Sequence, residues 1–313
     1  MSVKIPSSGR VVSKSMKIST TPAPMEAVGG VVNDITINDT TYRVHSFTSS
    51  GILTVTTAGT AEYLVIAAGG GGGSSRLSLL GPFNNKAFYQ SGGGGGAGGF
   101  LSGNVNLSAT TYEITIGAGG AGGSWPGSPD SFTGTTESNP GTTGDPSKIA
   151  FYPGGSSLVE SYGGGGGGAG ASVGLNGGSG GGGGVSNSPY PVGPPQPAGS
   201  YATKANLPGG AGTVGQGNDG SPGEGPTSIY DTYSYAGGGG GAGSAGGGPL
   251  PTGAGGIGKE SAITSNSQVY ATGGSGGGQS DGFANTGNGG GGGSTSGGGS
   301  GGSGVVIIRY RIA

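Results

Sequence analysis

The sequence contains no cysteine, one histidine (His45) and one tryptophan (Trp125) among its 313 residues. Without cysteine there are no disulfides and no thiolate metal ligands, which excludes the small disulfide-rich secreted scaffolds. The absence is compatible with a protein that folds in a reducing cytosol and later acts outside cells.

Charge and long apolar runs are also scarce. Only 8% of the residues are charged and the formal net charge is -2, so no long-range field would recruit nucleic acid or an anionic membrane. No run of 18 apolar residues could span a bilayer, and the Ser/Pro/Lys-containing start lacks the apolar stretch of a signal peptide. We therefore expect no nucleic-acid partner, no membrane insertion and no export by signal peptide.

Glycine dominates what is present, with 86 glycines beside 19 prolines. A large hydrophobic core is excluded, because so few side chains can fill it. Ordering that many glycines costs on the order of 100 kcal/mol of conformational entropy. Backbone hydrogen bonds net only about 0.5–1.5 kcal/mol each, so nearly every peptide group must be paired with an adjacent backbone.

The chain divides into an arm and a glycine-rich domain. Residues 1–30 show no persistent strand or helix period and are interpreted as an N-terminal arm for attachment to a larger particle; residues 31–313 form the second unit. β-branched and aromatic residues predict strands in this unit. They lie at 35–37, 42–47, 52–55, 63–66, 112–116 and 305–312, within a scaffold of residues 34–68, 111–116 and 304–312.

Alternation in 42–47 and 308–312 indicates one covered and one wetter face, which predicts a small two-layer β-sandwich with little or no helix. The polyglycine region is inserted between the strands. Tyr89, Tyr162 and Tyr235 each precede a glycine run and are 73 residues apart, as expected for rods that cross one slab in parallel. We expect bundled polyglycine helices with three residues per turn, in which Gly92, Gly163 and Gly237 are structural.

Catalysis and cofactor binding find little support in the sequence. His45 lies inside a predicted strand and comes before every serine in a Gly-x-Ser-x-Gly pattern, contrary to the hydrolase order. A structural or solvent-facing role fits it better. The carboxylates are scattered, so we expect no catalytic residues, no metal site and no cofactor, and the protein is interpreted as a non-enzyme.

The aromatic residues lie mostly between the glycine runs, beside serine, glycine and asparagine. The three spaced tyrosines are expected to pack against the edge of the slab. Aromatics in the loops are expected to be exposed, a composition typical of recognition surfaces. The candidate binding residues are Trp125, Phe132, Tyr190, Tyr201, Tyr230 and Tyr233.

Four anchors carry a family resemblance: Tyr42-Arg-Val-His-Ser-Phe-Thr-Ser-Ser-Gly51, Ala61-Glu-Tyr-Leu-Val-Ile-Ala-Ala-Gly69, Ile114-Thr-Ile-Gly-Ala-Gly-Gly120 and Gly304-Val-Val-Ile-Ile-Arg-Tyr310. Together they resemble the glycine-rich domain of bacteriophage tail proteins, and the chain is similar to the distal tail-fibre adhesins of T-even-type phages. The resemblance covers roughly residues 30–313. It implies stacked polyglycine helices whose loops at one end contact the host surface.

The resemblance leads to the expectation of a virion adhesin, a tail-fibre tip that binds a host surface glycan or outer-membrane protein through the inter-run loops. It would be made in the host cytoplasm and act on the virion. The attachment candidates in the arm are Lys4, Arg10, Lys14 and Lys17, facing other tail or fibre proteins. The alternative is a non-catalytic structural virion protein, such as a head fibre, decoration or collar component. The oligomeric state stays open between a single chain and a homotrimer.

Overall fold

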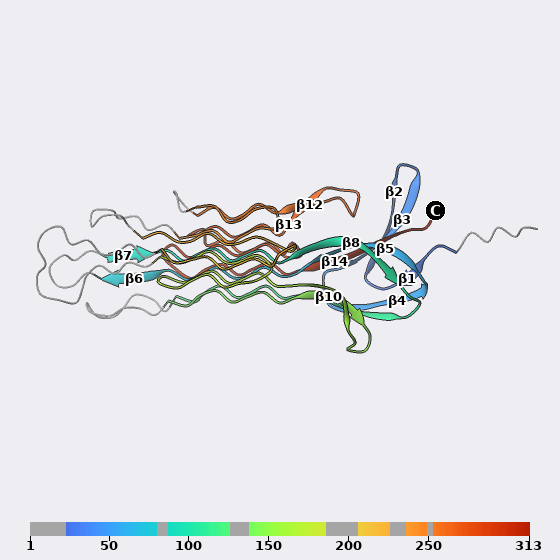
Figure 1. Ribbon diagram of the computed structural model, residues 1–313, viewed down its shortest axis with the longest axis horizontal. Coiled ribbons are helices and arrows are strands. Elements are labelled where there is room, and N and C mark those ends of the chain that lie inside the picture. Colours follow the sequence, from blue (N-terminus) through green and yellow to red (C-terminus); the bar gives the residue numbers. More distant parts are fainter. Residues whose placement is uncertain (1–22, 80–86, 126–137, 186–205, 226–235, 249–252) are drawn as a thin grey trace, which may run out of the picture.

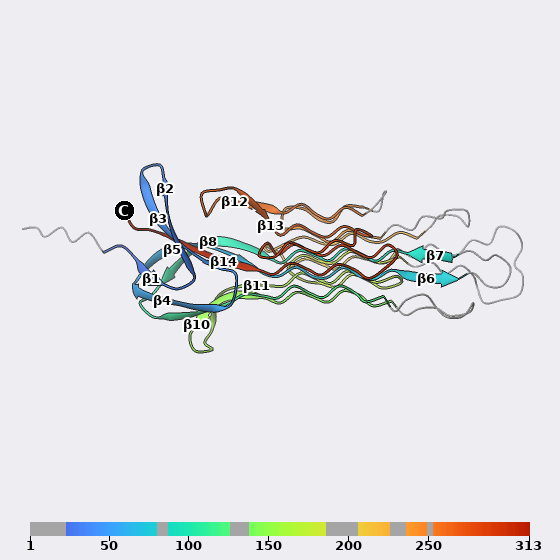
Figure 2. The same ribbon diagram turned by 180° about the vertical axis from the view of Figure 1, so that it is seen from behind.

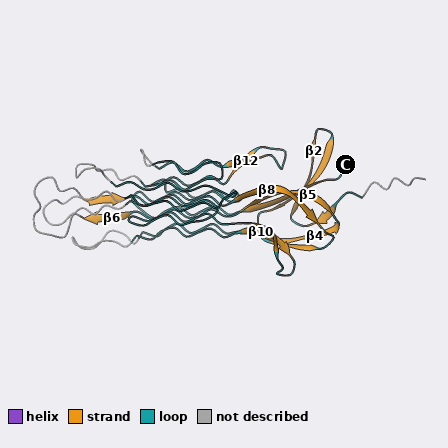
Figure 3. Ribbon diagram, viewed as in Figure 1, coloured by secondary structure: helices purple, strands orange, loops and turns teal. Residues whose placement is uncertain are grey.

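The computed structural model describes residues 23–79, 87–125, 138–185, 206–225, 236–248 and 253–313. Within these residues the chain consists of strands and extended segments, without a helix (Figure 3). The strands are β1 (Glu26–Val28), β2 (Val31–Ile37), β3 (Thr40–Phe47), β4 (Gly51–Thr57), β5 (Gly59–Ile66), β6 (Arg76–Leu79), β7 (Ala87–Gln90), β8 (Phe100–Leu107), β9 (Thr111–Thr115), β10 (Ser147–Phe151), β11 (Ser157–Ser161), β12 (Lys259–Ser261), β13 (Gln268–Tyr270) and β14 (Val305–Arg311). The expectation of a mainly β fold is confirmed for this part of the chain.

Two five-stranded antiparallel sheets form a sandwich at one end of the molecule (Figure 1). One has the order β1-β4-β9-β10-β11 and the other β2-β3-β14-β5-β8. Leu53 and Ile114 from the first sheet share a buried apolar core with Val65 and Ile308 from the second. Each such side chain contributes about 1.5–3 kcal/mol on burial. The alternation of strand side chains brings these residues to one face of each sheet.

The outer face of the second sheet is also covered, contrary to the wetter face expected from the alternation. Val44 of β3 and Ile307 of β14 pack with Ile263 and Tyr270, which belong to the hairpin formed by β12 and β13. Arg309 holds this hairpin by donating from Nη1 to the carbonyl oxygens of Ala262 (3.4 Å) and Ile263 (3.0 Å). The sequence did not predict this hairpin, so the cover over β3 and β14 was missed.

The glycine-rich segments extend from the sandwich along the long axis of the molecule, side by side (Figures 1 and 2). The chain enters them from β5 at Ile66 and returns through β14 at Val305. We call residues 67–75, 90–99, 117–125, 138–146, 162–185, 206–225, 236–248, 253–258 and 271–304 the glycine-rich region. Its end farthest from the sandwich is the distal end, where β6 and β7 lie.

All the strands that the sequence predicted are present, but the sandwich needs more of the chain than expected. β1 lies inside the segment interpreted as an irregular arm, and Met25 and Ala27 are buried in the core. Three residues are too few to show a period. β8, β10 and β11 were also missed, because β8 carries Gly103 and asparagines, and β10 and β11 are short, serine-containing strands.

Candidate binding surface at the distal end

Backbone hydrogen bonds join each glycine segment to several neighbours in turn. In residues 67–75, the amides of Gly70 and Gly73 donate to the carbonyls of Gly96 and Gly93, both at 2.9 Å. The amides between them reach two other segments: Gly71 donates to Thr142 and Gly72 donates to Gly299, also at 2.9 Å. The same neighbour therefore returns every three residues along this segment.

The carbonyls of the same segment point to further neighbours. Gly164 donates to Ala68 and Gly167 donates to Gly71, each at 2.8 Å, again three residues apart. Other carbonyls of the segment accept from residues 120–123 and 290–293. The segment is thus surrounded on all sides by backbone rather than by side chains, which is how a region with few apolar side chains satisfies its buried polar groups.

Close approach of the backbones explains the choice of glycine. A Cβ on Gly92 would lie 2.1 Å from the Gly73 carbonyl oxygen, and one on Gly163 would lie 1.8 Å from that of Gly144. On Gly237 it would lie 2.0 Å from the carbonyl oxygen of Ser221. Each of the sequence-selected glycines therefore occupies a position where any side chain would displace a neighbouring backbone.

The expectation of parallel rods holds for one pair of these glycine runs and is wrong for another. The runs after Tyr89 and Tyr162 are antiparallel, because Gly93 donates to Gly168 (2.7 Å) and Gly96 donates to Gly165 (2.7 Å). The runs after Tyr89 and Tyr235 are parallel, because Gly94 donates to Gly237 (3.0 Å) and Ala97 donates to Gly240 (2.9 Å). Tyr162 lies at the sandwich end of its segment and is 50% exposed, contrary to the packing expected of it. The side chain of Tyr89, and Tyr235, lie outside the described residues.

At the distal end, serine and asparagine side chains tie the segments together. The side chain of Ser74 forms two hydrogen bonds with the backbone of Asn139. Its hydroxyl donates to the backbone carbonyl (3.1 Å) and accepts from the backbone N–H (2.9 Å). Ser75 donates to the carbonyl of Ser296 (3.0 Å), and Ser138 donates to that of Gly170 (3.0 Å). These ties were missed from the sequence, although the Ser-Ser pair that ends the first glycine run is a usable signal.

The aromatic-bearing segments start and finish at this end. Their described flanks are residues 124–125 and 138–139, 185 and 206–207, and 225 and 236, and in Figure 1 the glycine-rich segments that lead to them run away from the sandwich. Trp125 is half-buried rather than fully exposed, and its buried indole N–H has no hydrogen-bond partner within the described part of the chain. The other aromatic candidates lie outside the described residues: Phe132, Tyr190, Tyr201, Tyr230 and Tyr233.

Both ends of the described chain lie at the opposite end, in the sandwich. β1 is the first strand, and the amide of Thr41 donates to the carbonyl of Ala313 at 3.0 Å. The attachment candidates Lys4, Arg10, Lys14 and Lys17 lie outside the described residues. The molecule therefore has one end that carries both ends of the described chain and another that carries the flanks of the variable segments (Figure 1).

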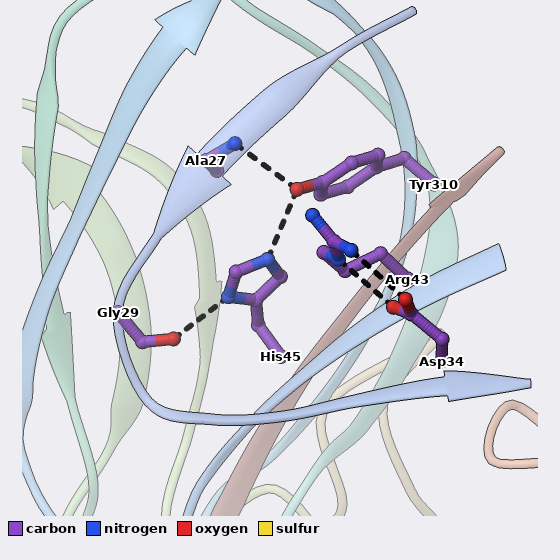
Figure 4. A network of polar contacts seen from close by, with 6 residues as sticks. All are labelled: Ala27, Gly29, Asp34, Arg43, His45 and Tyr310. Atoms are coloured by element: carbon purple, nitrogen blue, oxygen red, sulfur yellow. Dashed lines mark hydrogen bonds and ion pairs between the residues drawn. The ribbon is translucent and has the colours of Figure 1, made fainter. Parts of the chain in front are cut away.

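The surroundings of His45 fit a structural role, which is one of the two roles expected from the sequence (Figure 4). It is fully buried, and its Nδ1 lies 2.7 Å from the carbonyl of Gly29, which can only accept, so Nδ1 carries the proton. Nε2 then accepts from the Tyr310 hydroxyl at 3.1 Å, and that hydroxyl accepts from the amide of Ala27 at 3.0 Å. Burial lowers the pKa of His45, and the positive charge of Arg43 lowers it further. The network joins β1 to the second sheet.

Neither a metal site nor a membrane-spanning helix is found among the described residues. No three His, Cys, Asp or Glu side chains gather there in a way that could hold a metal ion. No helix in the same residues is long and apolar enough to cross a membrane.

Comparison with models of known protein families assigns the chain to one family. A family model described as a glycine-rich domain matches residues 48–311, so the protein belongs to this family. The match begins directly after β3 and leaves β1, β2 and β3 outside it. A search of curated proteins found no significant match.

Proposed function

We propose that the protein is a phage virion adhesin, a glycine-rich tail-fibre tip that binds a host surface glycan or outer-membrane protein. The observation that carries the proposal is the difference between the two ends of the molecule. The flanks of the aromatic-bearing segments gather at the distal end, while both described chain ends lie in the sandwich. A tip protein needs this arrangement, with one end for the particle and the other for the host.

We also propose that the glycine segments are polyglycine II helices bundled into a slab. The support is the three-residue return of each hydrogen-bonding neighbour, because an extended helix with three residues per turn repeats its directions at that interval. The Cβ positions add support, since the neighbouring backbones approach to a distance that only glycine permits.

The way in which the glycine-rich region is held together supports recognition by the loops. Backbone hydrogen bonds and the ties at Ser74 and Ser75 fix the flanks, so the segments between them can differ in sequence without changing the body. Aromatic residues beside serine, glycine and asparagine give rigid contact area and adaptable hydrogen bonding. The act proposed is binding, without a chemical step and without a cofactor.

The resemblance to phage tail proteins supplies the setting of this proposal. The protein is made in the host cytoplasm and carried on the virion, where Lys4, Arg10, Lys14 and Lys17 contact other tail or fibre proteins. The receptor contacts come from Trp125 and the loop aromatics Phe132, Tyr190, Tyr201, Tyr230 and Tyr233.

The test is saturable binding of the fluorophore-labelled full chain to intact candidate host bacteria. Loops containing Tyr190, Tyr201 and Tyr230 are each replaced by Gly/Ser segments of equal length. A matched control replaces the exposed turn at Tyr152, which joins β10 to β11 at the sandwich end. Loss of binding in loop variants that melt like the parent, with binding kept in the control, supports the adhesin.

Two results would contradict the adhesin proposal. Loop variants that bind as well as the parent would place recognition elsewhere on the molecule. Absence of binding to a bacterium that the particle infects would favour the alternative, a head fibre, decoration or collar protein.

A further inference from the structure

Arg76 brings a positive charge to the distal end that no acidic side chain of the described residues pairs with. It begins β6, which lies at this end (Figure 1), and the ion pairs of the described chain both lie in the sandwich. Arg76 is half-buried, and its Nε is buried without a hydrogen-bond partner in the same part of the chain. A guanidinium has donors and no acceptor, so what this group lacks is an oxygen that accepts, above all an anionic one.

Trp125 supplies a second donor without an acceptor on a neighbouring segment. Its indole N–H is buried without a partner among the described residues, and the indole ring can only donate. The segment that ends in Trp125 runs parallel to the segment that leads into Arg76, because Gly123 donates to Gly72 at 2.8 Å and the residues three earlier on each segment are bonded in the same way. This register brings Trp125 level with the residue two before Arg76, which is about 6 Å along an extended three-residue helix.

Serine and asparagine side chains connect these two positions. Asn139 donates from Nδ2 to the hydroxyl of Ser124, the residue before the tryptophan, at 2.9 Å. The neighbouring Ser138 donates from its hydroxyl to the carbonyl of Gly170 at 3.0 Å. A Cβ built on Gly170 would lie 2.6 Å from the Cβ of Arg76, so the arginine lies directly against that residue. We call the following residues the Arg76 patch: Arg76, Ser124, Trp125, Ser138 and Asn139.

The chemistry of the Arg76 patch matches an acidic sugar better than a protein surface. A guanidinium binds a carboxylate or a phosphate through two parallel N–H bonds. The other polar side chains of the patch are neutral hydroxyls and an amide, which donate and accept as sugar hydroxyls do. A protein partner would bury apolar anchors in well-packed, fully desolvated pockets, whereas the tryptophan is the one large apolar side chain of this patch.

We propose that the Arg76 patch binds an anionic group, a carboxylate or a phosphate, on a glycan of the host surface. The proposal rests on the proposed function and narrows its receptor from a glycan or a protein to an acidic glycan. Oxygens of the anionic group accept from the guanidinium of Arg76, and a further oxygen of the sugar accepts from the indole N–H of Trp125. Arg76 is then a binding residue that the sequence analysis did not select.

The test uses the fluorescence of the full chain, in which Trp125 is the only tryptophan and therefore reports on the patch. The probes are methyl glucuronide, glucose 1-phosphate and methyl glucoside, at millimolar concentrations and constant ionic strength. At least one acidic sugar should change the emission saturably and bind at least about tenfold more tightly than methyl glucoside, because its hydrogen bonds are charge-assisted. An equal response to all three probes, or to none, would overturn the proposal. Inorganic phosphate that binds as tightly as glucose 1-phosphate, with no response to methyl glucuronide, would also overturn it, because the sugar would then contribute nothing.

Substitutions of Arg76 and of a distant arginine provide matched variants. Arg76→Met removes the guanidinium and keeps an unbranched stem against Gly170, so it is expected to melt like the parent and to lose the preference for the acidic sugar. Arg76→Lys keeps the charge without the planar fork and should restore only part of that preference. Arg311→Met changes an exposed arginine of β14 in the sandwich and should bind like the parent. If Arg76→Met does not fold, Arg76→Lys decides, and parental affinity in that variant would contradict bidentate binding.

Host cells test whether the same contact serves attachment. On bacteria that bind the full chain, Arg76→Met should lose saturable binding and Arg311→Met should keep it. Unchanged cell binding by Arg76→Met would overturn the assignment of the receptor to an acidic glycan. The sugar titration involves no cells, so its failure leaves the adhesin proposal standing with a protein as the receptor. Conversely, binding of acidic sugars through Arg76 without attachment to any host would refute only the adhesin.

Discussion

Substitution of Gly71 by alanine tests whether backbone contact holds the glycine-rich region together. A Cβ at this position would lie 2.0 Å from the carbonyl oxygen of Ala121. A carbon and an oxygen normally approach to about 3.3 Å, so the segment that contains Ala121 must move by roughly 1.3 Å. Bonds of 2.8–2.9 Å that this segment makes, from Gly123 to Gly72 and from Thr142 to Ala121, would then exceed hydrogen-bond length.

The expected cost of Gly71→Ala is large for a single methyl group. Each buried backbone group left without a partner costs about 1–3 kcal/mol, and two bonds are affected, so we expect a loss of roughly 2–6 kcal/mol. That is a substantial part of the 5–15 kcal/mol by which typical domains are stable. The usual effect of Gly→Ala at an unstrained site has the opposite sign, about 0.4–1 kcal/mol of stabilisation.

Gly248→Ala is the matched control, because nothing lies within 4 Å of its Cβ position and its φ is not positive. Denaturant unfolding should place this variant within about 0.5 kcal/mol of the parent, and amide exchange should be unchanged. Gly71→Ala should accelerate exchange of the Gly123 and Thr142 amides, which lose their acceptors. If the two variants unfold at the same denaturant concentration, the bundle is not held by the close backbone contacts that we describe.

Three further predictions concern the sandwich. Burial lowers the folded-state pKa of His45, so its contribution to the free energy of unfolding is complete above about pH 6.5, the unfolded value, and declines as the pH falls below it. Between pH 7.5 and 5 the denaturant midpoint of His45→Gln should therefore fall less than that of the parent. Tyr310→Phe should cost about 1–3 kcal/mol in denaturant unfolding and accelerate exchange of the Ala27 amide, which loses its acceptor. Arg309→Gln should loosen the hairpin turn at Ile263, which would be measured as faster amide exchange there. Arg309→Lys should not restore protection, because lysine lacks the planar guanidinium fork. Unchanged exchange in Arg309→Gln would contradict the role given to this side chain.

The sequence predicted the strands whose side chains alternate and could not predict those that rely on their neighbours. The segments 42–47 and 305–312 carry aromatic and β-branched residues, and they became β3 and β14. β8 carries Gly103 and asparagine, and it is a strand because β5 offers a full eight-residue partner. Its local preferences are overridden by tertiary pairing.

The direction of the glycine segments was also beyond the sequence. Glycine has no side chain to mark a face or a partner, so the equal spacing of Tyr89, Tyr162 and Tyr235 could not fix the direction of each run. The structure contains both arrangements, since the run after Tyr89 is antiparallel to the run after Tyr162 and parallel to the run after Tyr235. Among the candidate binding residues only Trp125 is described, and its side chain is half-buried.

The reversal of the chain between consecutive segments separates the two ends of the molecule. Segments that follow each other in the chain, such as 67–75 and 90–99, run in opposite directions, so successive connections fall at opposite ends. The connection between β12 and β13 lies at the sandwich end against the second sheet, where Ile263 is buried, so its sequence is constrained by packing. The described flanks of the distal connections are held by serine ties and by backbone bonds of the glycine-rich region. Replacing a distal connection while keeping these flanks is therefore expected to leave the backbone bonds and the apolar core intact.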